Sequence, residues 1–300
     1  MMSPYFPFTG EPYTPTMGVK PLDLAAWLEP DGSLADDLAE KSRVLASARD
    51  LVLRVDPDPE KARAAAEAAE ELYADLERHL IQYHLTHYAL SDSGIRIHST
   101  GEVVSAGNGD AAERLAPLAA LIQEDVCLLS PTSPPRLAAG LVCFPSRWNI
   151  AEKIGLDAAA IHQPVPGFAR TLAQPATSFL ERITPERSFW RLNWTIHDSN
   201  VRFAPHPVRS RTDLTEDNVL ASTFLRIERQ TLRRLPMTGF VVFTIRTYID
   251  RLDGLVADPD RRERLRRTLD SMPDDAVAYK GMATFIAPLR RALAGRAGSQ

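Results

Sequence analysis

The sequence contains only two cysteines, Cys127 and Cys143, among 300 residues. Two thiols exclude a disulfide framework, a four-cysteine iron–sulfur cluster and a cysteine-rich zinc site within one chain. No stretch approaches the roughly 18 consecutive apolar residues of a membrane-spanning helix. The first residues show no basic segment followed by an apolar run, so no secretory signal is expected. These absences predict a cytoplasmic protein without membrane contact.

An excess of positive charge is also missing, because 39 acidic residues outnumber 35 basic ones and give a formal net charge of −4. Nucleic-acid-binding proteins normally carry a basic excess, so no nucleic-acid partner is expected. The motifs GxGxxG, GxxxxGK[ST] and GxSxG are absent as well, which argues against a dinucleotide fold, a P-loop and a serine-hydrolase elbow.

What is present predicts an α+β fold, with helices before and after a mostly antiparallel sheet. The first 20 residues are rich in proline and aromatics and predict an extended arm packed on the body. Apolar periodicity predicts helices over 21–28, 34–46, 59–90, 111–125, 260–271 and 274–294. It predicts strands over 95–98, 102–105, 126–129, 137–144, 188–197, 222–229 and 240–249. We expect one unit over 1–300, with a helical region 1–90, a core 91–257 and C-terminal helices 258–300.

His162 lies beside Pro164 and Pro166 in an apolar segment. The prolines restrict the backbone and would hold the imidazole in a narrow range of orientations, as a metal ligand requires. The alternative is a histidine at a helix end that is hydrogen-bonded in the interior.

The segment 189–196 alternates between two sets of side chains, as a strand does. One set is Trp190, Leu192, Trp194 and Ile196, and the other is Phe189, Arg191, Asn193 and Thr195. If both faces are buried, Arg191 needs an anionic or strongly dipolar partner. Otherwise its face is simply exposed to solvent.

The run 224–236 carries four arginines around one acid, Glu228. On a strand, Glu228 shares a face with Phe224, Arg226 and Gln230, where it could serve as a general base or as a partner for a cationic substrate. The alternative is a surface salt-bridge cluster.

His84 and His87 stand one turn apart at the end of the long predicted helix and could bind a metal together. No carboxylate or cysteine completes a known signature, and the neighbouring tyrosines indicate packing instead.

Six segments, in order over nearly the whole chain, carry a resemblance: 4–8, 144–155, 161–166, 191–194, 226–236 and 243–248. Two blocks are especially specific, His-x-Pro-Val-Pro at 162–166 and Glu-Arg-Gln-Thr-Leu-x-Arg-Leu-Pro at 228–236. The chain resembles the haem-dependent oxidative N-demethylase α-subunit family. That resemblance implies a PAS-like, haem-binding fold with His162 as the proximal ligand of the iron. The missing Cys-x-x-Cys-His motif agrees with a non-covalent haem b.

The resemblance also implies an activity, the oxidation of a small secondary amine such as dimethylamine with O2 and release of formaldehyde. Electrons would come from NADPH through a separate flavin and [2Fe–2S] reductase component. Arg191 would be a distal donor to dioxygen, and Glu228 would accept from the ammonium of the substrate. Further residues expected at the haem are Pro164, Val165, Trp194, Arg226 and Arg246. The alternatives are a non-catalytic haem-binding or gas-sensing protein, for which no output module is visible, and a small-molecule-binding module without haem.

Overall fold

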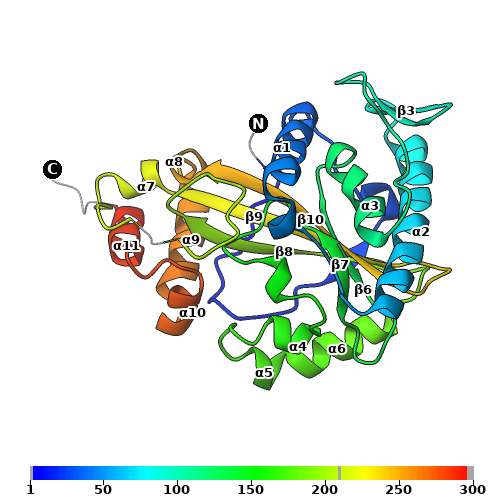
Figure 1. Cartoon of the computed structure of the whole chain (residues 1–300). Coiled ribbons are helices and arrows are strands. Elements are labelled where there is room, and N and C mark those ends of the chain that lie inside the picture. Colours follow the sequence, from blue (N-terminus) through cyan, green and yellow to red (C-terminus); the bar gives the residue numbers. More distant parts are fainter. Residues whose placement is uncertain (1–2, 209–210, 296–300) are drawn as a thin grey trace.

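The centre of the molecule is a seven-stranded sheet in the order β1-β8-β9-β10-β6-β7-β2, in which every neighbouring pair is antiparallel (Figure 1). The computed structural model describes residues 3–208 and 211–295. The strands are β1 (Lys20–Leu22), β2 (Leu53–Val55), β6 (Asp125–Leu129), β7 (Leu137–Leu141), β8 (Ser188–His197), β9 (Phe224–Arg234) and β10 (Val241–Arg251). A second sheet contains β3 (Tyr88–Ser91), β4 (Gly94–Ile97) and β5 (Val103–Val104). The expected α+β class with a mostly antiparallel sheet is confirmed.

Helices cover both faces of the large sheet and one of its ends (Figure 1). One face carries α1 (Leu34–Val52), α2 (Pro59–Tyr83) and α3 (Ala111–Leu115), which continues into the 3-10 turn η2 (Ala116–Ala120). The other carries η3 (Ile150–Glu152), α4 (Ala158–Ile161), α5 (Phe168–Thr171) and α6 (Ala173–Arg182). The C-terminal helices are α7 (Val219–Ser222), α8 (Leu252–Leu255), α9 (Pro259–Asp270), α10 (Asp274–Tyr279) and α11 (Ile286–Ala294). Within the described ranges, no helix has the length and apolar character needed to cross a bilayer.

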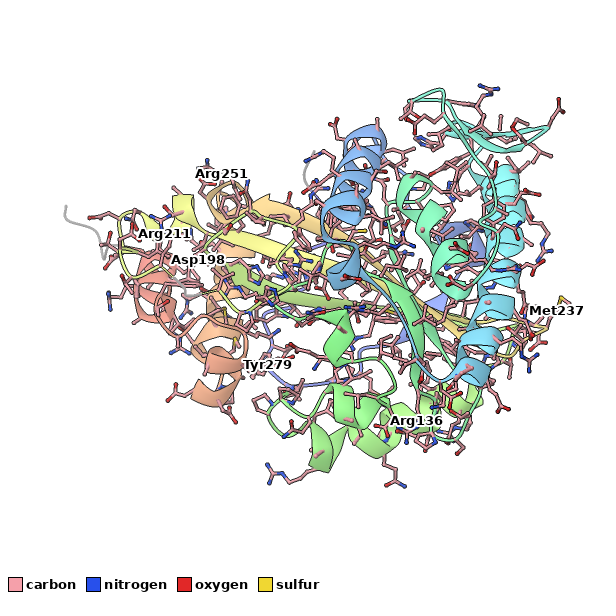
Figure 2. The ribbon with its side chains drawn as sticks, viewed as in Figure 1. Arg136, Asp198, Arg211, Met237, Arg251 and Tyr279 are labelled. Atoms are coloured by element: carbon pink, nitrogen blue, oxygen red, sulfur yellow. The ribbon has the colours of Figure 1, made fainter. Side chains whose placement is uncertain are left out.

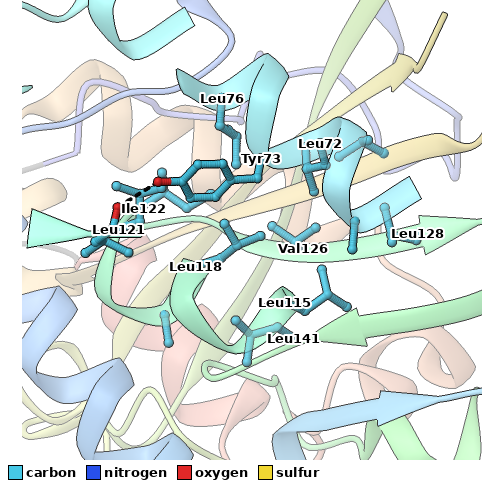
Figure 3. Close-up of a cluster of buried hydrophobic side chains, with 14 of the residues drawn as sticks. Leu72, Tyr73, Leu76, Leu115, Leu118, Leu121, Ile122, Val126, Leu128 and Leu141 are labelled. Atoms are coloured by element: carbon cyan, nitrogen blue, oxygen red, sulfur yellow. Dashed lines mark hydrogen bonds between the residues drawn. The ribbon is translucent and has the colours of Figure 1, made fainter. Parts of the chain in front are cut away.

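The main apolar core lies between the N-terminal helices and the sheet (Figure 3). Leu72 and Leu76 of α2 and Leu115 of α3 are fully buried there against Val126 and Leu128 of β6. Helix α2 begins at Pro59 because the side chain of the preceding Asp58 accepts hydrogen bonds from the backbone N–H groups of Glu60 and Lys61. The Asp58 side chain therefore caps the N-terminus of this helix and fixes where it begins.

Most observed elements differ from the expected ones at their ends, whereas the helix expected over 274–294 is two separate helices, α10 and α11. The strand expected over 188–197 is present with those bounds, whereas β9 extends five residues beyond the expected end, to Arg234. The helix expected over 59–90 ends at Tyr83, since the chain turns at His84 to enter β3. The helix expected over 21–28 is instead strand β1 followed by the 3-10 turn η1 (Leu24–Ala26). The proline-rich arm packs on the body as expected, with Phe8 buried against Trp194.

A buried charge network joins α1 to the sheet. Asp37 is 1% exposed and accepts hydrogen bonds from Arg246 Nη1 at 2.8 Å and Gln123 Nε2 at 2.6 Å. Arg202 also pairs with this carboxylate, and Arg246 Nη2 reaches Asp31 at 2.9 Å. Charges held away from water require such partners, and removing one partner leaves the others uncompensated.

We therefore expect Asp37→Ala to lower the free energy of unfolding by about 3–5 kcal/mol, because Arg246 and Arg202 lose a buried counter-charge. The neighbouring Asp36 is exposed on the same first turn of α1, so Asp36→Ala is a matched control that should cost less than about 1 kcal/mol. Urea denaturation of the two variants measures the difference. Equal losses would show that the network does not hold α1 to the sheet.

Candidate functional site

The register of β8, β9 and β10 gathers polar side chains on one face of the sheet. Residues directly opposite each other in an antiparallel pair share a face. Asn193 lies opposite Glu228, which in turn lies opposite Thr247. Applying the same rule along the strands defines the polar face: Arg191, Asn193, Thr195, Arg226, Glu228, Gln230 and Thr247. The apolar neighbours of these residues, Phe189 and Leu232, pack in the same cluster as side chains of α4 and α6, so the polar face lies on the α4–α6 side.

Glu228 is the central carboxylate of the polar face and is 8% exposed. Its Oε2 accepts hydrogen bonds from Asn193 Nδ2 at 3.2 Å and Gln230 Nε2 at 3.1 Å. Its Oε1 lies 3.4 Å from Arg226 Nε. These three donors fix the orientation of the carboxylate and leave it acceptor capacity for a ligand.

Arg226 is 1% exposed and is bound mainly to the protein itself. Its guanidinium donates to the backbone oxygens of Phe144 and Arg202 and, at 3.3 Å, to Thr247 Oγ1. The run 224–236 is thus no surface salt-bridge cluster. Arg226 lies beside Glu228 as expected, and it also attaches the segment after β7 to the sheet.

Arg191 differs from Arg226 because its charge is unpaired. Its Nε is buried without a hydrogen-bond partner, and no salt bridge joins its guanidinium to a carboxylate in the described part of the chain. It interacts electrostatically with Glu228 and Tyr279, while burial lowers the pKa of the guanidinium. An arginine stays charged at any ordinary pH, so this position holds a half-buried cation with free donors.

His162 follows the last residue of α4, whose first turn is capped by the Asp157 side chain. Its Nδ1 lies 2.8 Å from the carbonyl oxygen of Ala158, so Nδ1 carries the proton and Nε2 keeps its lone pair. Gly167, at a φ of 75° that favours glycine, turns the chain so that Phe168 stacks on the imidazole with centroids 4.7 Å apart.

Burial lowers the pKa of His162, and the charges of Arg191 and Lys153 lower it further against the opposing effect of the Ala158 hydrogen bond. The effect of the Arg191 charge indicates that His162 lies near the Arg191 end of the polar face. A neutral imidazole with one nitrogen oriented by a backbone carbonyl and the other free is the form in which histidine binds a metal. The donor set therefore fits the axial ligation of a haem iron.

The structure brings only some of the expected residues to this site. Val165 is half-buried and Pro164 is exposed in the turn that follows His162, where the Val165 N–H donates to the His162 carbonyl. Trp194 and Arg246 lie on the opposite face of the sheet. Trp194 packs on Phe8 of the arm, and Arg246 belongs to the Asp37 network. The cause is that successive side chains of a strand point to opposite faces of the sheet. Trp194 is an odd number of residues from Arg191 on β8, so its side chain lies on the other face. Arg246 lies opposite Arg229, which is not on the polar face.

Two residues of this site come from the C-terminal helices and were missed by the sequence argument. Lys280 follows α10, and its Nζ donates to the backbone oxygen of Trp194 at 2.5 Å and lies 4.3 Å from the Trp194 ring centroid. Burial lowers the pKa of Lys280 to about 8, an effect that Glu228 opposes and Arg191 increases. Tyr279, the last residue of α10, is exposed at the side of the C-terminal helices that is nearer to the α4–α6 segment (Figure 2). The one sequence feature that could have drawn attention to Lys280 is that the chain has only five lysines.

The histidines at the end of α2 form no metal centre. Helix α2 ends before His84, whose Nε2 contacts His79 Nε2 at 3.2 Å. Over residues 3–208 and 211–295, no group of three or more His, Cys, Asp or Glu side chains is placed to hold a metal ion.

Comparison with known families gives a match over most of the chain. The model of a family described as haem-dependent oxidative N-demethylase, alpha subunit-like, matches residues 18–289 of the 300-residue chain. The matched range includes His162, the whole polar face and Lys280.

The lowered pKa of Lys280 predicts how stability depends on pH. Between about pH 8 and the ordinary pKa of 10.5, the unfolded chain keeps the proton that the folded chain has released. Stability rises with pH wherever the unfolded state binds more protons. The wild type should therefore gain stability relative to Lys280→Met as pH rises through this window.

Urea denaturation of both proteins at pH 7 and pH 9.5 measures this gain. Lys20→Met, which removes an exposed lysine of β1, should keep the wild-type profile. Parallel profiles for the wild type and Lys280→Met would show that Lys280 is not a desolvated cation.

Proposed function

Because the chain belongs to the haem-dependent oxidative N-demethylase α-subunit-like family, we propose that it binds haem b through His162 and oxidatively demethylates a small secondary amine in the cytoplasm. The observation that carries this proposal is the neutral, oriented imidazole of His162 in one site with Arg191 and Glu228. Dimethylamine is the simplest substrate of this class. O2 and electrons from a separate flavin/[2Fe–2S] reductase complete the reaction.

His162 would hold the iron through Nε2, with Phe168 and the Ala158 carbonyl fixing the ring. The haem, when bound, supplies the redox chemistry that activates dioxygen. A ligand-bearing helical segment that precedes the long strands β8, β9 and β10 supports the PAS-like description of the fold.

Glu228 would bind the nitrogen of the amine through a charge-assisted hydrogen bond. Asn193 and Gln230 hold the carboxylate in place from one oxygen, and Arg226 approaches the other. The carboxylate can then orient the amine and take a proton from its nitrogen. Because Glu228, Gln230 and Arg226 are buried, each of these interactions is stronger than it would be in solvent.

Arg191 would supply positive charge and N–H donors where negative charge develops on dioxygen. Preorganised donors of this kind need no rearrangement during the reaction, which is why they stabilise developing charge efficiently. The buried Nε without a partner supports this role, since a donor that is satisfied by the protein has nothing left to offer a ligand.

We expect the wild type to bind added haemin with a sharp Soret band and His162→Ala to lose more than about tenfold in haemin affinity or to shift the band, since the axial nitrogen is gone. His98 is exposed and its ring bonds to the Thr86 carbonyl oxygen on the surface, so His98→Ala is the matched control and should behave as wild type. A haemin titration followed by absorption measures both. Failure of the wild type to give any Soret band would overturn the haem proposal in favour of a binding module without haem.

We further expect Glu228→Gln to retain haem but to bind dimethylamine about 10- to 100-fold more weakly, because a hydrogen bond to a charged group contributes about 1.5–3 kcal/mol. Amine-dependent shifts of the Soret band give the dissociation constant. Glu102→Gln is the control, because it removes an exposed carboxylate that is not part of the polar face. Haem binding without any amine-dependent shift in the wild type would instead favour the non-catalytic, gas-sensing alternative.

A further inference from the structure

The polar face and its C-terminal neighbour contain more positive charge than the site itself compensates. Arg191, Arg226 and Lys280 all interact with the single carboxylate of Glu228. Over residues 3–208 and 211–295, Arg226 alone forms a salt bridge with it, at 3.4 Å. Within the described ranges, neither Arg191 nor Lys280 lies within ion-pair distance of any carboxylate.

The partners that these two cations do have are weak ones for charged groups. Lys280 is held by one backbone carbonyl and one indole ring, both from Trp194. The buried Nε of Arg191 has no hydrogen-bond partner in the described part of the chain. Removing charge from water is costly unless an opposite charge compensates for it, so two neighbouring cations without one indicate a missing anion.

The same strand, β8, carries Arg191 and holds Lys280 at its edge. Arg191 lies two residues before Asn193 on β8 and opposite Gln230, next to Glu228 in the polar face. Lys280 binds the Trp194 carbonyl of the same strand, and the Thr195 hydroxyl donates to the Lys280 carbonyl at 3.2 Å. The two cations also interact with each other electrostatically. A planar guanidinium beside an ammonium is a donor set suited to a carboxylate.

We propose that Arg191 and Lys280 together bind a carboxylate of a small-molecule ligand beside Glu228. Arginine has five N–H donors, so a carboxylate on one edge leaves others for dioxygen. This inference rests on the proposed haem site, and the carboxylate has two sources. It is either a propionate of the haem or the carboxylate of an N-methylated amino acid, whose ammonium end would meet Glu228.

The test compares two pairs of probes that differ only in the charge of the carboxyl group or in its presence. The first pair is haemin and haemin dimethyl ester, titrated into the haem-free protein. The second is N-methylglycine and dimethylamine, titrated into the haem-loaded protein and followed by the Soret shift. We expect the wild type to favour the acid member of at least one pair by tenfold or more. A preference in the first pair assigns the carboxylate to the haem, and one in the second assigns it to the substrate.

Lys280→Met and Arg191→Gln should each reduce that preference by tenfold or more while keeping affinity for the probe without a free carboxylate. Lys20→Met should leave it unchanged. If a Soret band forms but no preference exists, or if both variants keep the wild-type ratios, the carboxylate site is refuted and the haem proposal stands. If neither haemin nor its ester produces a Soret band, the proposed function fails and this inference fails with it.

Discussion

The four arginines of β9 are the connection on which the arrangement of the molecule depends. Because side chains alternate along a strand, they leave β9 on both faces of the sheet. Arg226 reaches the backbone of the segment after β7, and Arg229 reaches the Trp27 carbonyl before α1. Arg233 pairs with Asp75 of α2 at 2.9 Å, and Arg234 donates to the Ile183 carbonyl after α6. One strand therefore fixes the N-terminal helices on one side and the α4–α6 segment on the other.

This arrangement separates the two tasks of the sheet. The face toward α1 and α2 neutralises its charges internally, as the Asp37 and Arg246 pair at 2.8 Å shows. Among the residues that the structure describes, Arg191 and Lys280 have no carboxylate within ion-pair distance, and Glu228 is the one carboxylate of the polar face. Buried charges are stable where they are paired and chemically available where they are not. The unpaired ones lie on the side that also holds His162.

Much of the fold could be predicted from sequence because β8 shows period-two alternation, and because α2 begins at a proline and has helical spacing. The ends of helices and strands were harder to predict. The end of α2 at Tyr83 depends on the pairing of β3 with β4, which the local sequence pattern of α2 does not reveal. In the site, His162, Arg191 and Glu228 were named from motif and alternation, and they do share one region. Trp194 and Arg246 were grouped with them because they lie in matching motifs, and a motif does not show on which face of the sheet a side chain lies. Lys280 was missed because it lies 86 residues after Trp194 in the sequence and is brought to β8 only by tertiary packing.

The position of Lys280 also explains why the C-terminal helices matter to a site formed mainly by the sheet. Strand β1 covers β8 only from Ser188 to Trp190, so the edge of β8 beyond that point is left without a strand partner on that side. The Trp194 carbonyl on this edge is taken by Lys280 instead. An exposed strand edge must be covered or paired, and here a cation does so. The same hydrogen bond that covers the edge of β8 also places a positive charge at the border of the polar face. A single residue, Lys280, therefore does both.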